Sequence, residues 1–133
     1  MTFLDTSTAI DFLLGDGVAG EVGALLEYEG VLAAPDLLVF EVLAVLRREV
    51  QRGELAGARA DGAVEDIGDL PVDLFPGLPL RARAWELRQN LTVADAIFAA
   101  LAERLGEPLV TKDRGLAAAA RAHAGIEVVL LPE

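Results

Sequence analysis

The 133-residue sequence contains no cysteine, one histidine and one lysine, and these shortages exclude several kinds of site. Without cysteine, the chain can form neither a disulfide nor a Cys-ligated zinc site. His123 is the sole histidine and no G-x-S-x-G motif accompanies it, which argues against a Ser-His-Asp hydrolase. The chain also lacks a G-x-x-x-x-G-K-[ST] loop, so we expect no P-loop nucleotide site.

Long apolar runs are missing as well. The most apolar stretch, residues 37–46, is too short to cross a bilayer and contains Glu41. The N-terminus has neither a basic start nor a signal-like apolar run. We therefore expect a cytoplasmic protein with no membrane contact. Because 53% of the residues are hydrophobic, we also expect a single domain over residues 1–133 with one core.

Positive charge is scarce, with 11 basic residues against 22 acidic ones and a net charge of −11. This balance argues against a nucleic-acid partner, because phosphates are attracted to basic surfaces. It does not forbid one, since acidic residues gathered around bound cations become attractive to phosphate. The basic residues that could steer such a partner are Arg47, Arg48, Arg81, Arg83, Lys112 and Arg114, although each is also an ordinary solvated side chain.

Short apolar segments alternate with segments of helical periodicity along the whole chain. We predict strands over residues 2–4, 31–34, 71–75, 109–111 and 128–131. We predict helices over residues 5–14, 18–28, 35–52, 54–70, 80–87, 91–106 and 114–122. Strands that alternate with helices are typical of an α/β fold with a mostly parallel sheet.

Glu41 is the most informative residue, because it is the only polar side chain among residues 37–46. On a helix, its neighbours three and four positions away include Leu38 and Val45. An isolated carboxylate on an apolar face is unfavourable unless it is paired, protonated or bound to a metal ion. A buried ion pair, or a glutamate pointing outward at the edge of the core, would also explain it.

Three further acidic residues follow strands or begin helices. Asp5 follows the first predicted strand and Asp113 follows the fourth, which places both at the carboxyl edge of a parallel sheet, where ligands bind. Asp95 lies three residues after Thr92 at the start of the clearest helix. Each of the three is also a common helix-capping residue. If they gather with Glu41, their oxygen atoms favour a hard cation, Mg²⁺ or Mn²⁺.

Four segments together resemble the PIN domain family, and more narrowly the toxin nucleases of the VapBC type. They are residues 4–7 (LDTS), 35–42 (PDLLVFEV), 91–96 (LTVADA) and 109–116 (LVTKDRGL). The resemblance implies a three-layer fold with a central five-stranded sheet and helices on both faces. It also implies that the first and fourth strands are neighbours, which would bring Asp5 and Asp113 together.

By the same resemblance, Asp5, Glu41, Asp95 and Asp113 form an acidic quartet that holds the metal ion. Asp5 and Asp95 would be direct ligands, and Glu41 and Asp113 would complete the site partly through water. Three hydroxyl residues match positions at which the family orients carboxylates or waters: Thr6, Ser7 and Thr111. Each of these hydroxyls is also explained by a cap or a strand end.

The implied activity is metal-dependent hydrolysis of RNA, and the implied partner is a VapB-like antitoxin protein. We also expect a homodimer, because two short helices carry a large apolar load that we expect to be partly exposed. The apolar residues in question are Ile10, Phe12, Leu13, Leu14, Val18, Val22, Leu25 and Leu26. Alternatives are a phosphatase or receiver-like signalling domain, and an acidic binding module without catalysis. Ser7 stands where a D-x-D phosphatase needs its second aspartate, and Asp5 lacks the acidic neighbour of a receiver domain.

Overall fold

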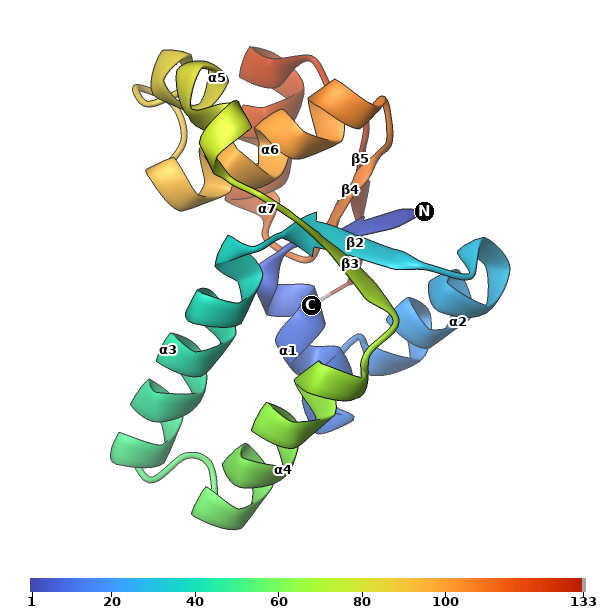
Figure 1. Ribbon diagram of the computed structural model, residues 1–133, viewed down its shortest axis with the longest axis vertical. Coiled ribbons are helices and arrows are strands. Elements are labelled where there is room, and N and C mark those ends of the chain that lie inside the picture. The colour runs from blue at the N-terminus through green and yellow to red at the C-terminus, as the bar shows by residue number, and fades with distance from the viewer. Residues whose placement is uncertain (133) are drawn as a thin grey trace.

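In the computed structural model, which describes residues 1–132, a five-stranded sheet forms the centre of the protein (Figure 1). All neighbouring strands are parallel, in the order β3-β2-β1-β4-β5. The strands are β1 (Thr2–Leu4), β2 (Leu32–Pro35), β3 (Val72–Phe75), β4 (Leu109–Thr111) and β5 (Val128–Leu130). The predicted α/β class and the predicted pairing of the first and fourth strands are both confirmed.

Helices cover both faces of this sheet. One layer contains α1 (Thr6–Leu14), α2 (Ala19–Glu29), α3 (Leu37–Gln51) and α4 (Gly57–Asp69), which pack against one another. The opposite layer contains the short η1 (Leu78–Leu80), α5 (Arg81–Glu86), α6 (Val93–Leu105), α7 (Arg114–Ala119) and the π-helical turn η2 (Ala120–Ala124). Figure 1 shows the two groups on either side of the strands, so the predicted three-layer arrangement is confirmed.

The three middle strands are buried on both faces. Every residue of β1, β2 and β4 is buried, whereas the edge strands β3 and β5 are largely exposed. This is the pattern of a parallel sheet covered by helices, in which central strands read as continuous apolar runs. Helix α6 approaches the sheet through four buried alanines, Ala96, Ala99, Ala100 and Ala102. The carboxyl ends of β1 and β4 therefore lie side by side in a rigid centre.

Two segments differ from the predicted elements. The alanine-rich helix keeps regular α geometry only to Ala119 and ends in the π-helical turn, which carries the exposed His123. The polar helix predicted from residue 54 begins at Gly57, because residues 52–55 form a turn that includes Gly53 at φ +73°. Within residues 1–132, no helix is long and apolar enough to cross a membrane.

Most of the apolar side chains of α1 and α2 that were expected to be partly exposed pack against the core. Val18 and Val22 are fully buried, and the other six residues that suggested an exposed surface are half-buried and pack against the core. Large apolar side chains that are more than half exposed lie at Tyr28 near the end of α2, at Phe40 on α3, at Leu78 in η1, at Trp85 on α5 and at Val93 at the start of α6. The expectation of a partly exposed apolar surface on these helices therefore holds for six of the eight residues, and further exposed apolar side chains lie on other elements.

Candidate metal centre

A cavity of about 370 Å³ opens where the carboxyl ends of β1 and β4 meet the first turns of α1 and α6. All four acidic residues predicted from the sequence line it: Asp5, Glu41, Asp95 and Asp113. Each comes from a different part of the chain. Carboxylates are the most numerous polar groups in the described cavity wall. The topology of the sheet therefore assembles the predicted quartet around one space.

Asp5 is buried and its carboxylate is held from several sides. The backbone N–H of Thr8 donates to its Oδ1 atom at 3.1 Å, which makes Asp5 the N-cap of α1. The hydroxyl of Thr111 donates to Oδ2 at 2.5 Å, and that of Ser7 donates at 2.9 Å to Oδ1 and 3.0 Å to Oδ2. Asp5 is therefore both a cap and a cavity-lining group, so the two interpretations of this residue are compatible.

Glu41 extends from α3 toward the same cavity and is half-buried. The hydroxyl of Thr6 donates to its Oε1 atom at 2.6 Å. A hydroxyl donor fixes one carboxylate oxygen without neutralising the charge. The lone polar residue of the apolar stretch is therefore explained by its position at the cavity rather than by an ion pair.

Asp95 lies in the first turn of α6, and its backbone N–H donates to the hydroxyl of Thr92 at 3.1 Å, which makes Thr92 the predicted N-cap. Its carboxyl group lines the cavity, and burial raises its pKa above the usual aspartate value. The negative charges of Asp113, Glu41 and Asp5 raise this pKa further, and the hydrogen bond with Thr92 opposes them. The four carboxyl groups of the quartet therefore interact electrostatically across the cavity.

Asp113 is the N-cap of α7, since the backbone N–H of Leu116 donates to its Oδ1 atom at 3.0 Å. The backbone N–H of Asp113 in turn donates to the hydroxyl of Thr111 at 3.0 Å. Because Thr111 also donates to Asp5, this one buried hydroxyl connects two of the four acidic residues. Thr6, Ser7 and Thr111, the three hydroxyl residues singled out in the sequence, all contact the quartet or its backbone.

A lysine–aspartate pair in the cavity wall was not predicted. Lys112 donates from Nζ to Oδ2 of Asp11 at 2.6 Å, and this oxygen also accepts the backbone N–H of Val18 at 3.1 Å. At Gly17 (φ +50°), any side chain would collide with the Asp11 carboxylate. The available signal was the same as for Glu41, namely an isolated acidic residue among apolar residues on a helix.

The other basic residues named as steering candidates are dispersed. Arg48 lines the cavity, and Arg47 and Arg114 are exposed. Arg83 pairs with Glu103 at 2.9 Å and with Glu86 at 3.0 Å. In the cavity wall, Lys112 is therefore paired with Asp11, and Arg48 is the other basic residue among the described lining residues.

The donor atoms fit a hard divalent cation. They are carboxylate and hydroxyl oxygens, which suit Mg²⁺ or Mn²⁺. Within residues 1–132, however, no three acidic or histidine side chains lie close enough together to ligate one ion directly. Mg²⁺ tolerates this spacing, because it usually keeps several water ligands and takes only one or two carboxylates from the protein.

The chain matches the PIN domain family model over residues 2–122. It is 37% identical over 129 residues to ribonuclease VapC9 of Mycobacterium tuberculosis, an alignment that covers 97% of this chain and 98% of that protein. Among solved structures, PAE2754 from Pyrobaculum aerophilum is similar with a TM-score of 0.72 and 24% identity, over 97% of this chain and 83% of that one. VapBC-5 from Mycobacterium tuberculosis, a member of the VapBC family of toxin-antitoxin systems, gives a TM-score of 0.58 and 24% identity, over 98% of both chains. The cavity thus lies in a chain that belongs to the PIN domain family and, within it, to the VapC ribonucleases.

Proposed function

We propose that this protein is a metal-dependent endoribonuclease that hydrolyses RNA phosphodiester bonds and acts as the toxin of a VapBC-type pair. The observation that carries the proposal is the convergence of Asp5, Glu41, Asp95 and Asp113 on one cavity, in a chain related to VapC ribonucleases. The phosphotransfer alternative has no comparable support. Ser7, where a D-x-D phosphatase would carry its second aspartate, donates its hydroxyl to Asp5.

In this proposal, Asp5 and Asp95 hold Mg²⁺ or Mn²⁺ directly, and Glu41 and Asp113 hold its water ligands. When bound, the cation supplies a water of lowered pKa and stabilises charge that develops on the phosphate. The chain itself supplies orientation. Three hydroxyls and the capped start of α1 fix the Asp5 carboxylate, and Thr6 fixes one oxygen of Glu41. Because these hydrogen bonds are present before a cation binds, the carboxylates of Asp5 and Glu41 need little further ordering when it does.

The direct test is cleavage of a labelled RNA by the purified protein with and without metal. We expect cleavage in millimolar Mg²⁺ or Mn²⁺, none in excess EDTA, and recovery when Mg²⁺ is added beyond the EDTA concentration. If water attacks the phosphorus and the 3′ oxygen leaves, the new 5′ end carries phosphate and the new 3′ end a hydroxyl, and these are the ends that we expect. Undiminished cleavage in EDTA would exclude the metal-dependent mechanism.

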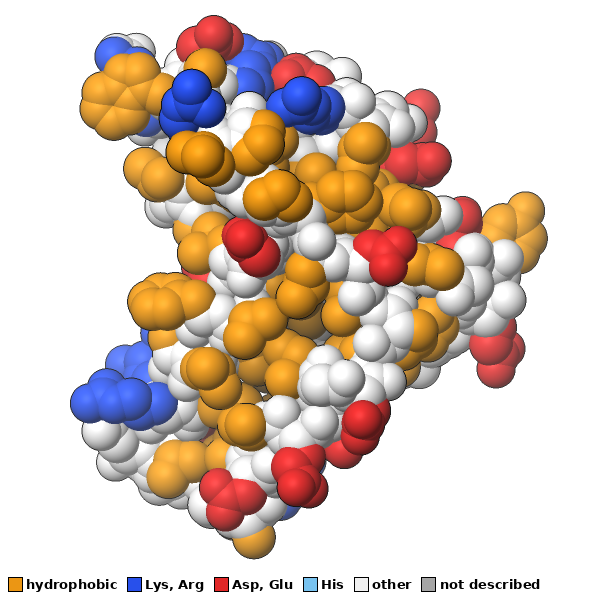
Figure 2. Space-filling model, in the orientation of Figure 1, with side chains coloured by type: hydrophobic (Ala, Val, Ile, Leu, Met, Phe, Trp, Pro, Cys, Tyr) orange, Lys and Arg blue, Asp and Glu red, His pale blue; other side chains and the backbone are white. Residues whose placement is uncertain are grey.

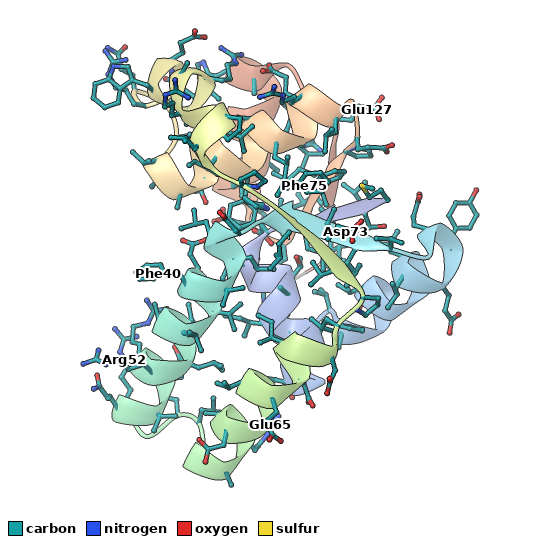
Figure 3. The ribbon with its side chains drawn as sticks, viewed as in Figure 1. Phe40, Arg52, Glu65, Asp73, Phe75 and Glu127 are labelled. Atoms are coloured by element: carbon teal, nitrogen blue, oxygen red, sulfur yellow. The ribbon has the colours of Figure 1, made fainter. Side chains whose placement is uncertain are left out.

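A groove between α3 and α4 is the position we propose for an apolar segment of the antitoxin. Its volume is about 400 Å³, and its lining includes Leu43, Val50 and Val64, each of which is more than a third exposed. Phe40, 69% exposed, points outward from the same helix α3 (Figure 3). An amphipathic helix laid into such a groove buries apolar residues spaced three and four positions apart.

We expect Leu43→Asp to weaken capture of a VapB-like antitoxin by at least about tenfold while leaving the fold intact, because it places a charge in an apolar contact. Co-purification of the two proteins measures the loss, and Arg47→Ala, in the same groove but polar, is the matched control. Light scattering of the protein alone tests the proposed homodimer. Equal capture by the parent and Leu43→Asp would contradict the proposed groove, and a monomeric mass at micromolar concentration would contradict the dimer.

A further inference from the structure

The only tryptophan of the chain, Trp85, lies on the surface and precedes Asp95 of the acidic quartet by ten positions in the sequence. Trp85 is 63% exposed, and Leu78, one residue before Pro79 in η1, is 72% exposed. Arg81, Trp85 and Arg88 follow one another at spacings of four and three residues, which places them on one face of the helical path through α5. Exposed apolar side chains that gather beside polar groups mark interaction sites, and here Leu78 and Trp85 lie close together in the sequence with arginines beside them.

This surface holds positive charge that nearby carboxylates do not neutralise. Arg81 donates to the backbone carbonyl of Leu78 at 3.0 Å, Arg88 to that of Trp85 at 2.7 Å, and Arg104 to that of Pro79 at 3.2 Å. Within the part of the chain that the structure describes, none of these three arginines forms a salt bridge. Figure 2 shows Lys and Arg side chains gathered with hydrophobic ones over α5, in a chain whose net charge is −11.

The arrangement of Trp85 and Arg88 matches the way proteins hold unpaired bases. The guanidinium carbon of Arg88 lies 4.3 Å from the centre of the Trp85 ring, in a cation–π contact. Stacking of bases on aromatic rings and on guanidinium planes, with arginines on the backbone phosphates, is the usual chemistry of single-stranded RNA recognition. We propose that Trp85, Arg81 and Arg88 form a stacking site for an unpaired base of single-stranded RNA.

This inference rests on the proposed ribonuclease function and deepens it. Helix α5 packs against α6, and α6 carries Asp95 in its first turn. A strand held at Trp85 therefore lies on a helix that packs against α6, and α6 contributes Asp95 and Phe98 to the wall of the acidic cavity. Its phosphates would meet Arg81, Arg88 and Arg104 here, in addition to Arg48 at the cavity, so the site contributes to RNA binding by an acidic protein.

The chain contains a natural comparison for Trp85. Tyr28 is 87% exposed on α2, but it lies between Glu27 and Glu29. It is therefore an exposed aromatic ring in negative surroundings, where RNA phosphates are repelled. Tyr28→Ala is accordingly the matched control for Trp85→Ala.

Because Trp85 is the sole tryptophan, its fluorescence reports on this site alone. The experiment titrates the full chain in EDTA with a single-stranded oligouridylate of about 12 nucleotides, a length within the usual site sizes for single strands. We expect saturable quenching of the tryptophan emission. By anisotropy of the labelled RNA, Trp85→Ala should bind about tenfold more weakly, whereas Tyr28→Ala should bind like the parent.

Arg88→Gln should reduce the magnitude of the slope of log K against log salt concentration by about 0.7, as expected for one lost phosphate contact on a single strand. In Mg²⁺, Trp85→Ala should raise KM for RNA cleavage and leave kcat unchanged. If Trp85 had only a structural role, Trp85→Ala would lower the melting temperature. The salt slope of Arg88→Gln would then equal that of the parent.

Absence of quenching, or equal RNA affinity of Trp85→Ala and the parent, would overturn the stacking site even if cleavage in Mg²⁺ is normal. Quenching that depends on protein concentration without RNA would also overturn it, since the surface would then join two copies of the chain. Quenching by RNA without any cleavage in Mg²⁺ would support the stacking site and contradict the proposed ribonuclease function instead.

Discussion

Replacing Asp95 with alanine is expected to lower the rate of RNA cleavage by at least about a hundredfold, and Asp5→Ala, Glu41→Ala and Asp113→Ala should have similar effects. Loss of a group that only supports a metal ligand typically costs 10–100-fold in activity, and loss of a ligand costs at least as much. The four effects should be far from additive, because the residues act on one cation. The measurement is kcat/KM at saturating Mg²⁺ for each purified variant.

Two controls separate chemistry from folding. His123→Ala should retain full activity, because His123 is exposed on η2 and does not line the cavity. Asp5 also caps α1, so Asp5→Ala is expected to lose about 1 kcal/mol of stability, whereas Asp5→Asn retains a side-chain oxygen for the cap. If Glu41→Ala is folded and fully active, the assignment of Glu41 to the metal centre is wrong.

The second expected result is a gain in stability. In EDTA at neutral pH, Asp95→Asn should be more stable than the parent by about 1 kcal/mol, after allowance for solvent screening. Burial and the charges of Asp113, Glu41 and Asp5 raise the pKa of Asp95 in the folded protein. When the pKa of a carboxyl group is higher in the folded protein than in the unfolded chain, the protein loses stability as the pH rises from the unfolded value through the folded value. Above that window the charged group opposes folding, and asparagine removes the charge while leaving the backbone cap to Thr92 intact.

The same pair of proteins should respond differently to Mg²⁺. The cation stabilises the parent by mass action, by about 1.4 kcal/mol for each tenfold excess over its Kd, and stabilises Asp95→Asn much less. Thermal melts of both proteins in EDTA and in millimolar Mg²⁺, at neutral pH and near pH 4, measure the difference. The advantage of Asp95→Asn in EDTA should shrink at the lower pH. Equal responses to Mg²⁺ would show that Asp95 does not hold the cation.

Several parts of this site could be predicted from local sequence because they depend on local chemistry. Glu41 was identifiable as the lone polar residue of an apolar stretch, and Asp5 and Asp113 as acidic residues that follow strands. The adjacency of β1 and β4 is a long-range property, and only the family resemblance predicted it. It brings the Asp5 carboxylate against a hydroxyl 106 positions later in the chain.

Other features depend on tertiary packing, which periodicity does not report. The Lys112–Asp11 pair joins residues 101 positions apart and requires the close approach of Gly17. From the sequence, α1 and α2 have more apolar side chains than two short helices are expected to bury. In the structure, α3 and α4 pack beside α1 and cover much of that surface. The exposure of Trp85 was not predicted from the sequence, and in the structure this residue lies on the short helix α5, which follows the single turn η1.

The central position of β1 has a consequence for the time course of biosynthesis. β1 is the first strand to leave the ribosome, but its neighbour β4 is not made until residues 109–111 are joined. Until then Asp5 lacks the Thr111 hydroxyl, and Asp113 does not yet exist. Because long-range pairing of parallel strands is slow and comes late in folding, a nascent chain has no complete acidic centre during most of its synthesis. If the acidic centre is the catalytic site that we propose, the nascent chain therefore stays inactive while most of its own messenger is translated.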